Sequence, residues 1–170
     1  MILLDFSQTM IGTFMAMGKG SVVVEEDLLR HTVLNTIRQY KHTHRHIYDT
    51  GGLVICCDSY KNWRKESFPE YKANRPPMPE DLVSQIEPIH KIIELMGIKL
   101  IMISGVEADD VIGTLAEQAR KKKLDTVIST GDKDMTQLVC ENVSVVNTMT
   151  GELLNESGVK KKFGVPPEHI

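Results

Sequence analysis

Three acidic side chains crowd into one short stretch of the sequence: Glu107, Asp109 and Asp110. The stretch follows an apolar run at 98–103 and precedes a helical pattern of apolar residues that begins at Val111. One or two acids in the first turn of a helix are ordinary, because the helix dipole favours negative charge there. A third is not, because carboxylates about 4 Å apart repel each other by roughly 1 kcal/mol even in water. Such crowding indicates a site that binds a cation.

Other acids occupy equivalent places, each directly after a further apolar run. They are Asp5, after the run at 1–4; Asp58, after 53–57; and the pair Asp132 and Asp134, after 126–129. Short apolar runs that alternate with helical patterns are typical of a parallel sheet, whose strands end at one common edge. A single Asp after a strand is often only a helix cap or a turn residue. The same placement after four strands favours one shared acidic site.

Carboxylate oxygens without converging His or Cys select hard cations, so the site is predicted to bind Mg²⁺, with Mn²⁺ as the alternative. Two such ions about 3.5–4 Å apart can clamp a phosphodiester. One ion then activates a water molecule and the other stabilises the departing oxygen. This chemistry also requires cationic side chains that hold the phosphate.

The stretch 59–75 offers such cations. It interleaves basic residues with aromatic ones: Lys61, Arg64, Lys65, Lys72 and Arg75 with Tyr60, Trp63, Phe68 and Tyr71. Basic residues follow a nucleic-acid backbone, while aromatic rings stack on bases, at roughly 1–3 kcal/mol per base. The alternative is a solvated basic loop whose aromatic residues pack on the sheet.

The elements that position these residues follow from hydrophobic periodicity. Buried strands are predicted at 1–6, 53–57, 98–103, 126–129 and 143–146. Helices are predicted at 25–42, from 79 to just before 97, from the acidic stretch to about 122, in a short segment through 138, and at 156–163. The stretch 7–21 is predicted as a loop or short helix, and 59–78 has no clear period. The pattern predicts an α/β fold with a mostly parallel central sheet and helices on both faces.

Composition is that of an ordinary globular protein. The 170 residues fit one domain, with 41% hydrophobic and 25% charged residues. No apolar run approaches the roughly 20 residues of a membrane span, and the start of the sequence lacks the features of a signal peptide. Three cysteines without CxxC spacing indicate a reducing compartment, so a cytoplasmic location is expected.

The net charge of −3 argues weakly against nucleic-acid binding, although metal-binding acids would offset basic surface elsewhere.

Four signatures together resemble the 5′-nuclease family, which includes bacteriophage RNase H and flap endonucleases and the 5′-exonuclease domain of bacterial DNA polymerase I. They are Leu4-Asp5-Phe6-Ser7, Pro69-Glu70-Tyr71-Lys72-Ala73-Asn74-Arg75, Gly105-Val106-Glu107-Ala108-Asp109-Asp110 and Ser129-Thr130-Gly131-Asp132-Lys133-Asp134-Met135-Thr136-Gln137-Leu138. They occur in family order, and the resemblance covers nearly the whole chain. It implies a PIN-like (resolvase-like) α/β fold. It also implies divalent-metal hydrolysis of DNA or RNA from a 5′ end, as in the removal of RNA primers and 5′ flaps during DNA replication and repair.

The resemblance further implies roles for single residues. In the family, two or more metals are surrounded, partly through water, by the residues matching Asp5, Asp58, Glu107, Asp109, Asp110, Asp132 and Asp134. Asp132 and Asp134 match the acids nearer the second metal. Lys72 and Arg75 match a basic pair at the scissile phosphate, and Tyr71 matches a residue that stacks on the terminal base. Catalysis is therefore expected from Lys72, Arg75, Asp5 and Asp132, and strand binding from Lys61, Arg64, Lys65, Tyr71, Lys72 and Arg75.

The expected partners are DNA with 5′ flaps or ends and RNA–DNA hybrids, in a bacterial cytoplasm or a phage-infected host, without a membrane. In the family, a further acidic motif and a helix–three-turn–helix follow the position of Ile170; residues 1–170 are expected to form a single domain without that region. Three hypotheses stay open. In the first, the chain is a Mg²⁺-dependent 5′-nuclease, which is weak, is completed by a separate C-terminal half, or is a fragment, and whose partners include replication proteins. In the second, it binds DNA or a partner without cutting. In the third, it is a small PIN-type RNase for single-stranded RNA.

Overall fold

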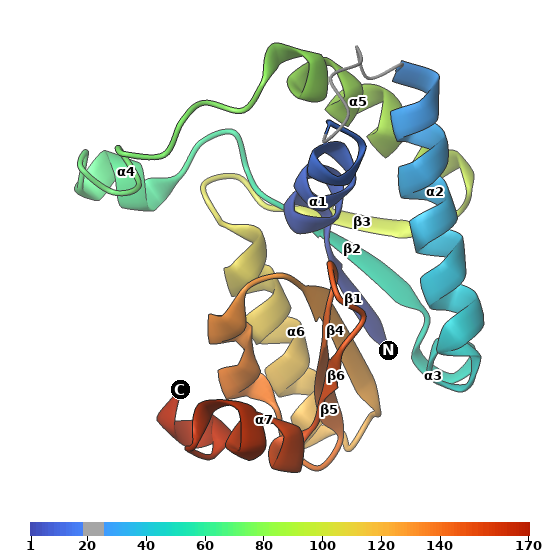
Figure 1. Ribbon diagram of the computed structural model, residues 1–170, viewed down its shortest axis with the longest axis vertical. Helices are drawn as coiled ribbons and strands as arrows, with labels where there is room; N and C mark the ends of the chain where they lie inside the picture. The colour runs from blue at the N-terminus through green and yellow to red at the C-terminus, as the bar shows by residue number, and fades with distance from the viewer. Residues whose placement is uncertain (19–25) are drawn as a thin grey trace.

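The computed structural model describes residues 1–18 and 26–170, and its centre is a six-stranded sheet in the order β3-β2-β1-β4-β5-β6 (Figure 1). The strands are β1 (Ile2–Asp5), β2 (Leu53–Cys57), β3 (Lys99–Met102), β4 (Thr126–Thr130), β5 (Val143–Asn147) and β6 (Leu153–Leu154). All neighbouring strands are parallel except β5 and β6. The predicted mostly parallel sheet is confirmed, with β6 as a short antiparallel edge.

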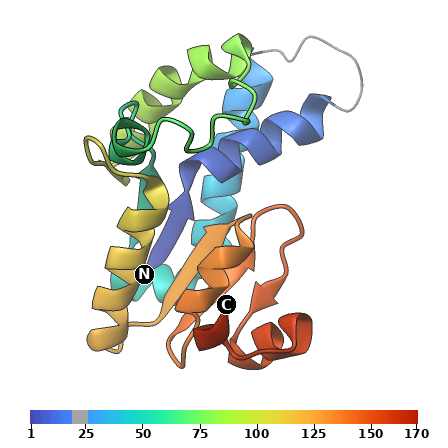
Figure 2. The ribbon, with the colours of Figure 1, turned by 90° about the vertical axis from the view of Figure 1, so that its left-hand side faces the viewer.

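Helices cover both faces of this sheet (Figures 1 and 2). One face carries α1 (Phe6–Gly18), α2 (Glu26–Thr43), α3 (Arg45–Gly51) and α5 (Glu80–Leu95). The other face carries α6 (Ala108–Lys121), the 3-10 helix η1 (Lys133–Leu138) and α7 (Glu156–Phe163), and the chain ends in the short 3-10 helix η2 (Pro167–His169). Residues of β1 show the division, because Ile2 and Leu4 belong to the first core and Leu3 to the second. Side chains alternate across a strand, so this short central strand supports both cores.

Some helical segments differ from the expectation. The stretch at 7–21 is a regular helix as far as residue 18, and it begins at Phe6, so β1 ends at Asp5. Residues 19–21 and 25 lie outside the described part of the chain. Two short helices, α3 and α4 (Trp63–Ser67), had no periodic signal, because 7 and 5 residues are too few to show an apolar stripe. They depend on local capping and tertiary contacts instead.

The register of the central strands places their carboxyl ends side by side. Asp5 is aligned with Cys56 of β2, and Leu4 is aligned with Ser129 of β4. The segments that follow these three strands therefore leave the sheet at the same edge, where the N-terminus of α6 also lies (Figure 2). In the described residues no helix is both long and apolar enough to cross a membrane.

Candidate metal and phosphate site

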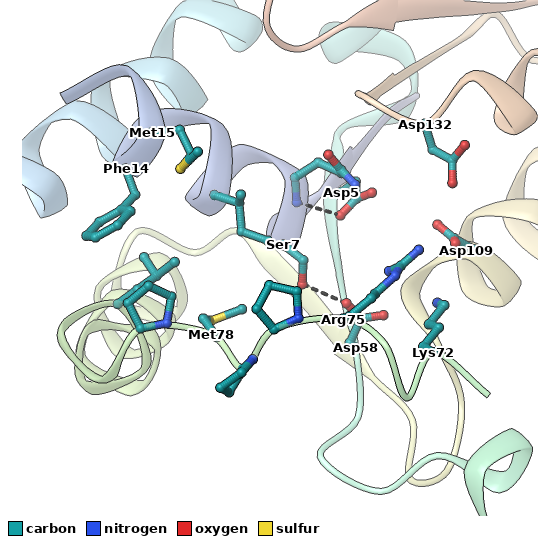
Figure 3. Close-up of a pocket in the computed structure, with 16 residues that line it drawn as sticks. Asp5, Ser7, Phe14, Met15, Asp58, Lys72, Arg75, Met78, Asp109 and Asp132 are labelled. Carbon is teal, nitrogen blue, oxygen red and sulfur yellow. Dashed lines mark hydrogen bonds between the residues drawn. The ribbon is translucent and has the colours of Figure 1, made fainter. Parts of the chain in front are cut away.

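A cavity of 430 Å³ opens at the carboxyl edge of the sheet, and four carboxylates from four segments line it (Figure 3). They are Asp5 at the end of β1, Asp58 after β2, Asp109 in the first turn of α6 and Asp132 after β4. Lys72 and Arg75 line the same cavity. These are acids and cations that the sequence predicted to converge, and the structure brings them together.

Asp5 is the most deeply buried of the four acids, at 3% exposure. Its two carboxylate oxygens accept hydrogen bonds from the Gln8 backbone N–H (3.1 Å) and the Thr130 hydroxyl (3.0 Å). Burial raises the pKa of Asp5 to about 7, and the nearby charges of Asp109 and Asp58 add to the rise. The charged form of Asp5 is therefore disfavoured mainly by burial, and further by the two neighbouring acids.

The other acids of the cavity are held by the backbone and by small polar side chains. Asp58 accepts hydrogen bonds from the Ser7 hydroxyl (2.6 Å) and from the Ala108 backbone N–H at the start of α6 (2.8 Å). Asp132 caps η1 by accepting from the Asp134 N–H (2.9 Å). Burial, with the charges of Asp132 and Asp58, raises the pKa of Asp109 to about 6. The four acids thus face one another at fixed positions and repel.

A hydrated divalent cation fits this donor set. Burial, and after it the charges of the neighbouring acids, raise the pKa of Asp5 and of Asp109, so a bound cation would favour the ionised form of both. In the described residues, no three His, Cys, Asp or Glu side chains lie close enough together to hold a metal ion by themselves. The acids therefore line an open cavity and form no closed cage. This arrangement suits Mg²⁺, which usually keeps several waters and binds through one or two carboxylates.

Folding stability is expected to depend on the charge of Asp5. A carboxyl group whose pKa rises from 3.8 to about 7 on folding disfavours the fold when ionised. The free energy of unfolding should therefore fall as the pH rises from about 4 to about 7, by at most roughly 4 kcal/mol above that range. Urea unfolding at about pH 5 and pH 8 measures the difference. The substitution Asp5→Asn should remove more than half of this difference between the two pH values, and millimolar Mg²⁺ should reduce the difference in the wild type. If the difference is unchanged in Asp5→Asn, the charge of Asp5 is not its cause.

Two further predicted ligands, Glu107 and Asp110, lie outside this cavity and bind basic side chains instead. Glu107 is 8% exposed and accepts hydrogen bonds from Lys72 (2.7 Å), from the Asn62 amide (2.7 Å) and from the Tyr71 hydroxyl (3.0 Å). Burial alone would raise the pKa of Glu107, but these donors, led by Lys72, hold it below its usual value. Glu107 is therefore ionised and already well supplied with donors.

Asp110 pairs with Arg64 through two hydrogen bonds, at 2.6 and 2.7 Å. The same guanidinium also lies 3.4 Å from a Glu107 oxygen. The hydrogen bonds from Arg64 lower the pKa of Asp110, and those to Asp110 raise the pKa of Arg64. Arg64 was predicted to bind nucleic acid, but in this structure its guanidinium is paired with acids of the protein. We call this cluster the acid–base anchor; its members are Asn62, Arg64, Tyr71, Lys72, Glu107 and Asp110.

Backbone hydrogen bonds join the same two segments. The Ser59 and Trp63 N–H groups donate to the carbonyls of Val106 (3.1 Å) and Gly105 (3.0 Å). Gly105 has a φ of +82°, in the region that favours glycine, and its N–H donates to the Ser59 hydroxyl (3.0 Å). The first part of the basic stretch is therefore attached along the loop that leads into α6, and the acid–base anchor completes the attachment.

Removing the Arg64 side chain is expected to destabilise the fold. Arg64→Ala would leave Asp110 without its bidentate partner, so we expect a loss of about 2 kcal/mol in the free energy of unfolding, typical of hydrogen bonds to charged groups. The matched control is Lys65→Ala, because Lys65 is exposed in the same short helix and forms no ion pair with any residue described. Urea unfolding of both variants measures the effect. A loss below about 0.5 kcal/mol for Arg64→Ala would mean that the anchor contributes nothing to stability.

The remaining predicted site residues lie at the margin of the cavity or away from it. Asp134 is exposed, and its backbone N–H, not its carboxylate, contacts Asp132. Lys61 is exposed, and Lys65 lines a neighbouring cavity together with Lys72 and Arg75. Tyr71 is half-buried, with its hydroxyl bound to Glu107. The residues predicted to bind a strand are thus spread along the basic stretch, and among them Lys72 and Arg75 line the cavity of the four acids.

Several polar residues that position the acids were not singled out from the sequence. Thr130 donates to Asp5 and accepts from the Asp132 N–H (3.1 Å), so it links two acids of the cavity. Ser7 orients Asp58, and Asn62 orients Glu107. No signal marks a Thr or Asn as a partner of a distant acid, because such residues are common caps and turn formers. Ser7 lies two residues after Asp5, and Thr130 is the last residue of β4, two residues before Asp132.

Comparison with known proteins identifies the chain's relatives. Residues 1–164 match the family described as "5′-3′ exonuclease, N-terminal resolvase-like domain". DNA polymerase I of Pseudomonas aeruginosa is 56% identical over 108 residues, which are 64% of this chain and 12% of that protein. A 5′-3′ exonuclease of Buchnera aphidicola is 49% identical over 124 residues, 72% of this chain and 41% of that protein. The chain therefore spans less than half the length of these relatives.

Solved structures show the same fold. The 5′-exonuclease of phage T5 with bound zinc ions has a TM-score of 0.67 at 19% identity, over 99% of this chain and 62% of that one. A complex of the phage T5 flap endonuclease with DNA and metal ions has a TM-score of 0.70 at 20% identity, over 96% of this chain and 60% of that one. At this identity the likeness concerns the fold, and it confirms the PIN-like architecture expected from the sequence.

Proposed function

This chain belongs to the 5′-3′ exonuclease family, as an N-terminal resolvase-like domain, and we propose that it hydrolyses phosphodiester bonds near 5′ ends of nucleic acids with the help of Mg²⁺. The observation that carries the proposal is the convergence of Asp5, Asp58, Asp109 and Asp132 with Lys72 and Arg75 in one cavity. Each of these six side chains comes from a predicted site position. Such a site requires acidic side chains that bind metal ions and basic side chains that hold the phosphate.

The four acids of the cavity would hold the metal ions. Two Mg²⁺ ions, with Mn²⁺ as a substitute, would supply an activated water and stabilise the leaving oxygen when bound. Asp5 and Asp109 are the strongest candidates for direct contact, because burial and mutual repulsion raise the pKa of both. Glu107, Asp110 and Asp134 stay candidates for contact through water, since they lie next to the cavity acids in sequence and outside the cavity itself.

Lys72 and Arg75 would hold the phosphate. Burial alone would lower the pKa of the Lys72 ammonium, but its hydrogen bond to Glu107 raises it above the usual value. Lys72 is thus charged and held at the cavity by a carboxylate. Arg75 is exposed and lines the same cavity, and its planar guanidinium matches the geometry of a phosphate. The pair supplies positive charge opposite the acids, where a phosphodiester would lie.

The other end of the cavity is apolar. Phe14 and Met15 of α1 face Met78 across it, away from the acids (Figure 3), and Ile11 and the prolines next to Met78 in the sequence also line the cavity. An apolar compartment next to a phosphate-binding end has the chemistry of a site for a sugar and a base. The cavity as a whole therefore suits one nucleotide of a strand, with its phosphate toward the four acids.

The proposed substrates are DNA with 5′ ends or flaps and RNA–DNA hybrids, such as RNA primers and flaps that arise in replication and repair. These substrates occur in the bacterial cytoplasm or a phage-infected host, where we propose the chain acts. A separate C-terminal half or replication proteins are proposed partners, because the curated relatives are more than twice as long as the matched region. Residues 1–170 are proposed to form one structural unit around the single sheet.

Cleavage assays test this proposal. The chain is incubated with 5′-labelled flap DNA, an RNA–DNA hybrid and single-stranded RNA, each with Mg²⁺ and with EDTA. We expect Mg²⁺-dependent cleavage of the first two; a preference for single-stranded RNA would instead favour a small PIN-type RNase. Activity that survives the double substitution Asp132→Ala and Asp134→Ala would rule against this site. Flap binding without turnover, even in Mn²⁺, would favour a non-catalytic binding protein.

A further inference from the structure

A second cavity, of 390 Å³, lies next to the acidic one. We call it the β3 pocket, because Met102 at the end of the edge strand β3 forms part of its wall; its other distinctive residues are Tyr60, Lys65, Val83, Ile86 and His90. Ser7, Asp58 and Met78 line both cavities. The Ser7 hydroxyl donates to Asp58 at 2.6 Å, so a rigid polar contact lies where the two cavities meet. A strand with a phosphate at the acids would therefore have this pocket beside it.

The walls of the β3 pocket are apolar and partly aromatic. Val83 and Met102 are 47% and 42% exposed, and Tyr60 at the same pocket is 77% exposed. His90 packs against the Phe6 ring at 4.5 Å between centroids, with the two ring planes tilted by 54°, so both rings lie in the pocket wall. Scattered apolar residues on a surface are ordinary, whereas several gathered around one hollow indicate a ligand. Rings and thioethers are surfaces on which a flat aromatic ligand packs well.

Among the described residues that line the pocket, Lys65 is the one Lys or Arg, and its side chain is placed differently from that of Arg64 before it. Arg64 is bound to Asp110, whereas Lys65 lines the pocket and forms no ion pair within 1–18 and 26–170. A Lys that is free at the edge of an apolar hollow can contact a phosphate while a base enters the hollow. The pocket thus repeats, on a smaller scale, the combination of charge and apolar surface found in the acidic cavity.

We propose that the β3 pocket binds one nucleobase of the single strand whose phosphate lies at the acidic cavity, an inference that rests on the proposed function. The occupant is a base and not a peptide side chain, because the pocket is continuous with a phosphate-binding cavity through Ser7, Asp58 and Met78. The pocket is larger than a purine, and Lys65 at its edge would contact the phosphate that adjoins the base. The pocket would position the strand by a base without reading its sequence.

An abasic scan of the strand tests the pocket without altering the protein. Flap DNAs that lack one base at successive positions are bound to the full chain in Ca²⁺, and affinity is measured by fluorescence anisotropy. Base packing worth roughly 1–3 kcal/mol predicts one position at which loss of the base weakens binding about 5- to 150-fold. The positions on either side should change by less than about twofold. A scan that is flat within about twofold at every position would overturn the proposal.

A variant that fills the pocket gives an independent measurement. Val83→Trp should weaken binding of intact flap DNA by about as much as removal of the critical base, and should have no further effect on DNA that already lacks this base. The matched control is Leu95→Trp, at the other end of α5, where the side chain is 76% exposed and lines neither cavity. Fold losses that multiply between Val83→Trp and the abasic site would overturn the assignment of the base to this pocket.

Different results would refute the proposed nuclease function and the proposed binding of a base in the β3 pocket. A chain that shows the position-specific loss of binding, but no Mg²⁺-dependent cleavage of any substrate, would refute the nuclease assignment and support the pocket. A chain that cleaves flap DNA, with a flat abasic scan, would refute the pocket alone. Binding that responds to neither the abasic site nor Val83→Trp, in a chain that still cleaves, would leave the acidic cavity as the substrate site and remove the β3 pocket from it.

Discussion

Asp109→Asn is expected to reduce Mg²⁺-dependent cleavage of flap DNA by about 10³-fold or more while the chain keeps its fold. The carboxylate of Asp109 lines the acidic cavity, and the charges of Asp132 and Asp58 contribute to its raised pKa, after burial. An amide has nearly the same shape but no charge, so the cation would lose one of its few anionic partners. Metal ions contribute several kcal/mol to such reactions, and each 1.36 kcal/mol corresponds to about a tenfold change in rate.

Stability should change in the opposite direction. The pKa of Asp109 is raised to about 6, so at about pH 8 the folded state carries an unfavourable charge that the unfolded chain does not feel. Asn at this position removes the charge, and we expect a gain of about 1–2 kcal/mol in the free energy of unfolding without metal. Glu117→Gln is the matched control, because Glu117 lies on the same helix outside the cavity, with a side chain that is 43% exposed and pairs with Arg120 and Lys121. Cleavage by Asp109→Asn within tenfold of wild type would refute the role of this acid.

The acids of the cavity could be predicted from the sequence because their positions follow from the sheet alone. Asp5 and Asp58 end or follow buried strands, and parallel strands present their carboxyl ends at one edge whatever the loops do. Asp132 follows β4 for the same reason. This inference required only the strand positions and their direction, which apolar runs indicate well.

The division of the acids into two groups could not be predicted in this way. Glu107 is the residue before the helix and Asp109 is in its first turn, so their side chains point in different directions, about half a turn apart, and face different neighbours. Which cations meet Glu107 depends on the path of 59–78, a stretch without a hydrophobic period. The sequence predicted that Arg64 binds a phosphate, because a sequence shows the charge of a side chain but not the acid with which it forms an ion pair. Its two hydrogen bonds to Asp110 appear only when α4 is attached to the loop before α6.

The backbone conformation of Lys72 is a further feature that the sequence did not predict. Its φ of +55° lies in the left-handed region, which costs a non-glycine residue about 1–2 kcal/mol. Strained backbone at a predicted functional residue is a common mark of a functional site. Here the strain accompanies the contact of the Lys72 ammonium with Glu107 at 2.7 Å, so the turn presents this amine to the acids.

Lys72→Ala and Lys72→Gly are expected to lose activity equally, by about 10²–10³-fold in kcat/KM, as for the loss of one group that stabilises charge in a transition state. Both lack the amine that we propose holds the phosphate, and both leave Glu107 with the donors Asn62 and Tyr71. Their stabilities should differ. Gly adopts a positive φ freely, so Lys72→Gly should be up to about 1 kcal/mol more stable than Lys72→Ala.

Lys123 provides the matched control for this pair. It follows α6, is exposed, and has a φ of +52°, so its backbone repeats that of Lys72 outside both cavities. Lys123→Gly should also be more stable than Lys123→Ala by up to about 1 kcal/mol, while both keep wild-type cleavage. Urea unfolding and kcat/KM on flap DNA, measured for all four variants, separate backbone strain from charge. If Lys72→Ala cleaves within threefold of wild type, the amine does not act on the phosphate, and the left-handed turn then serves the fold alone.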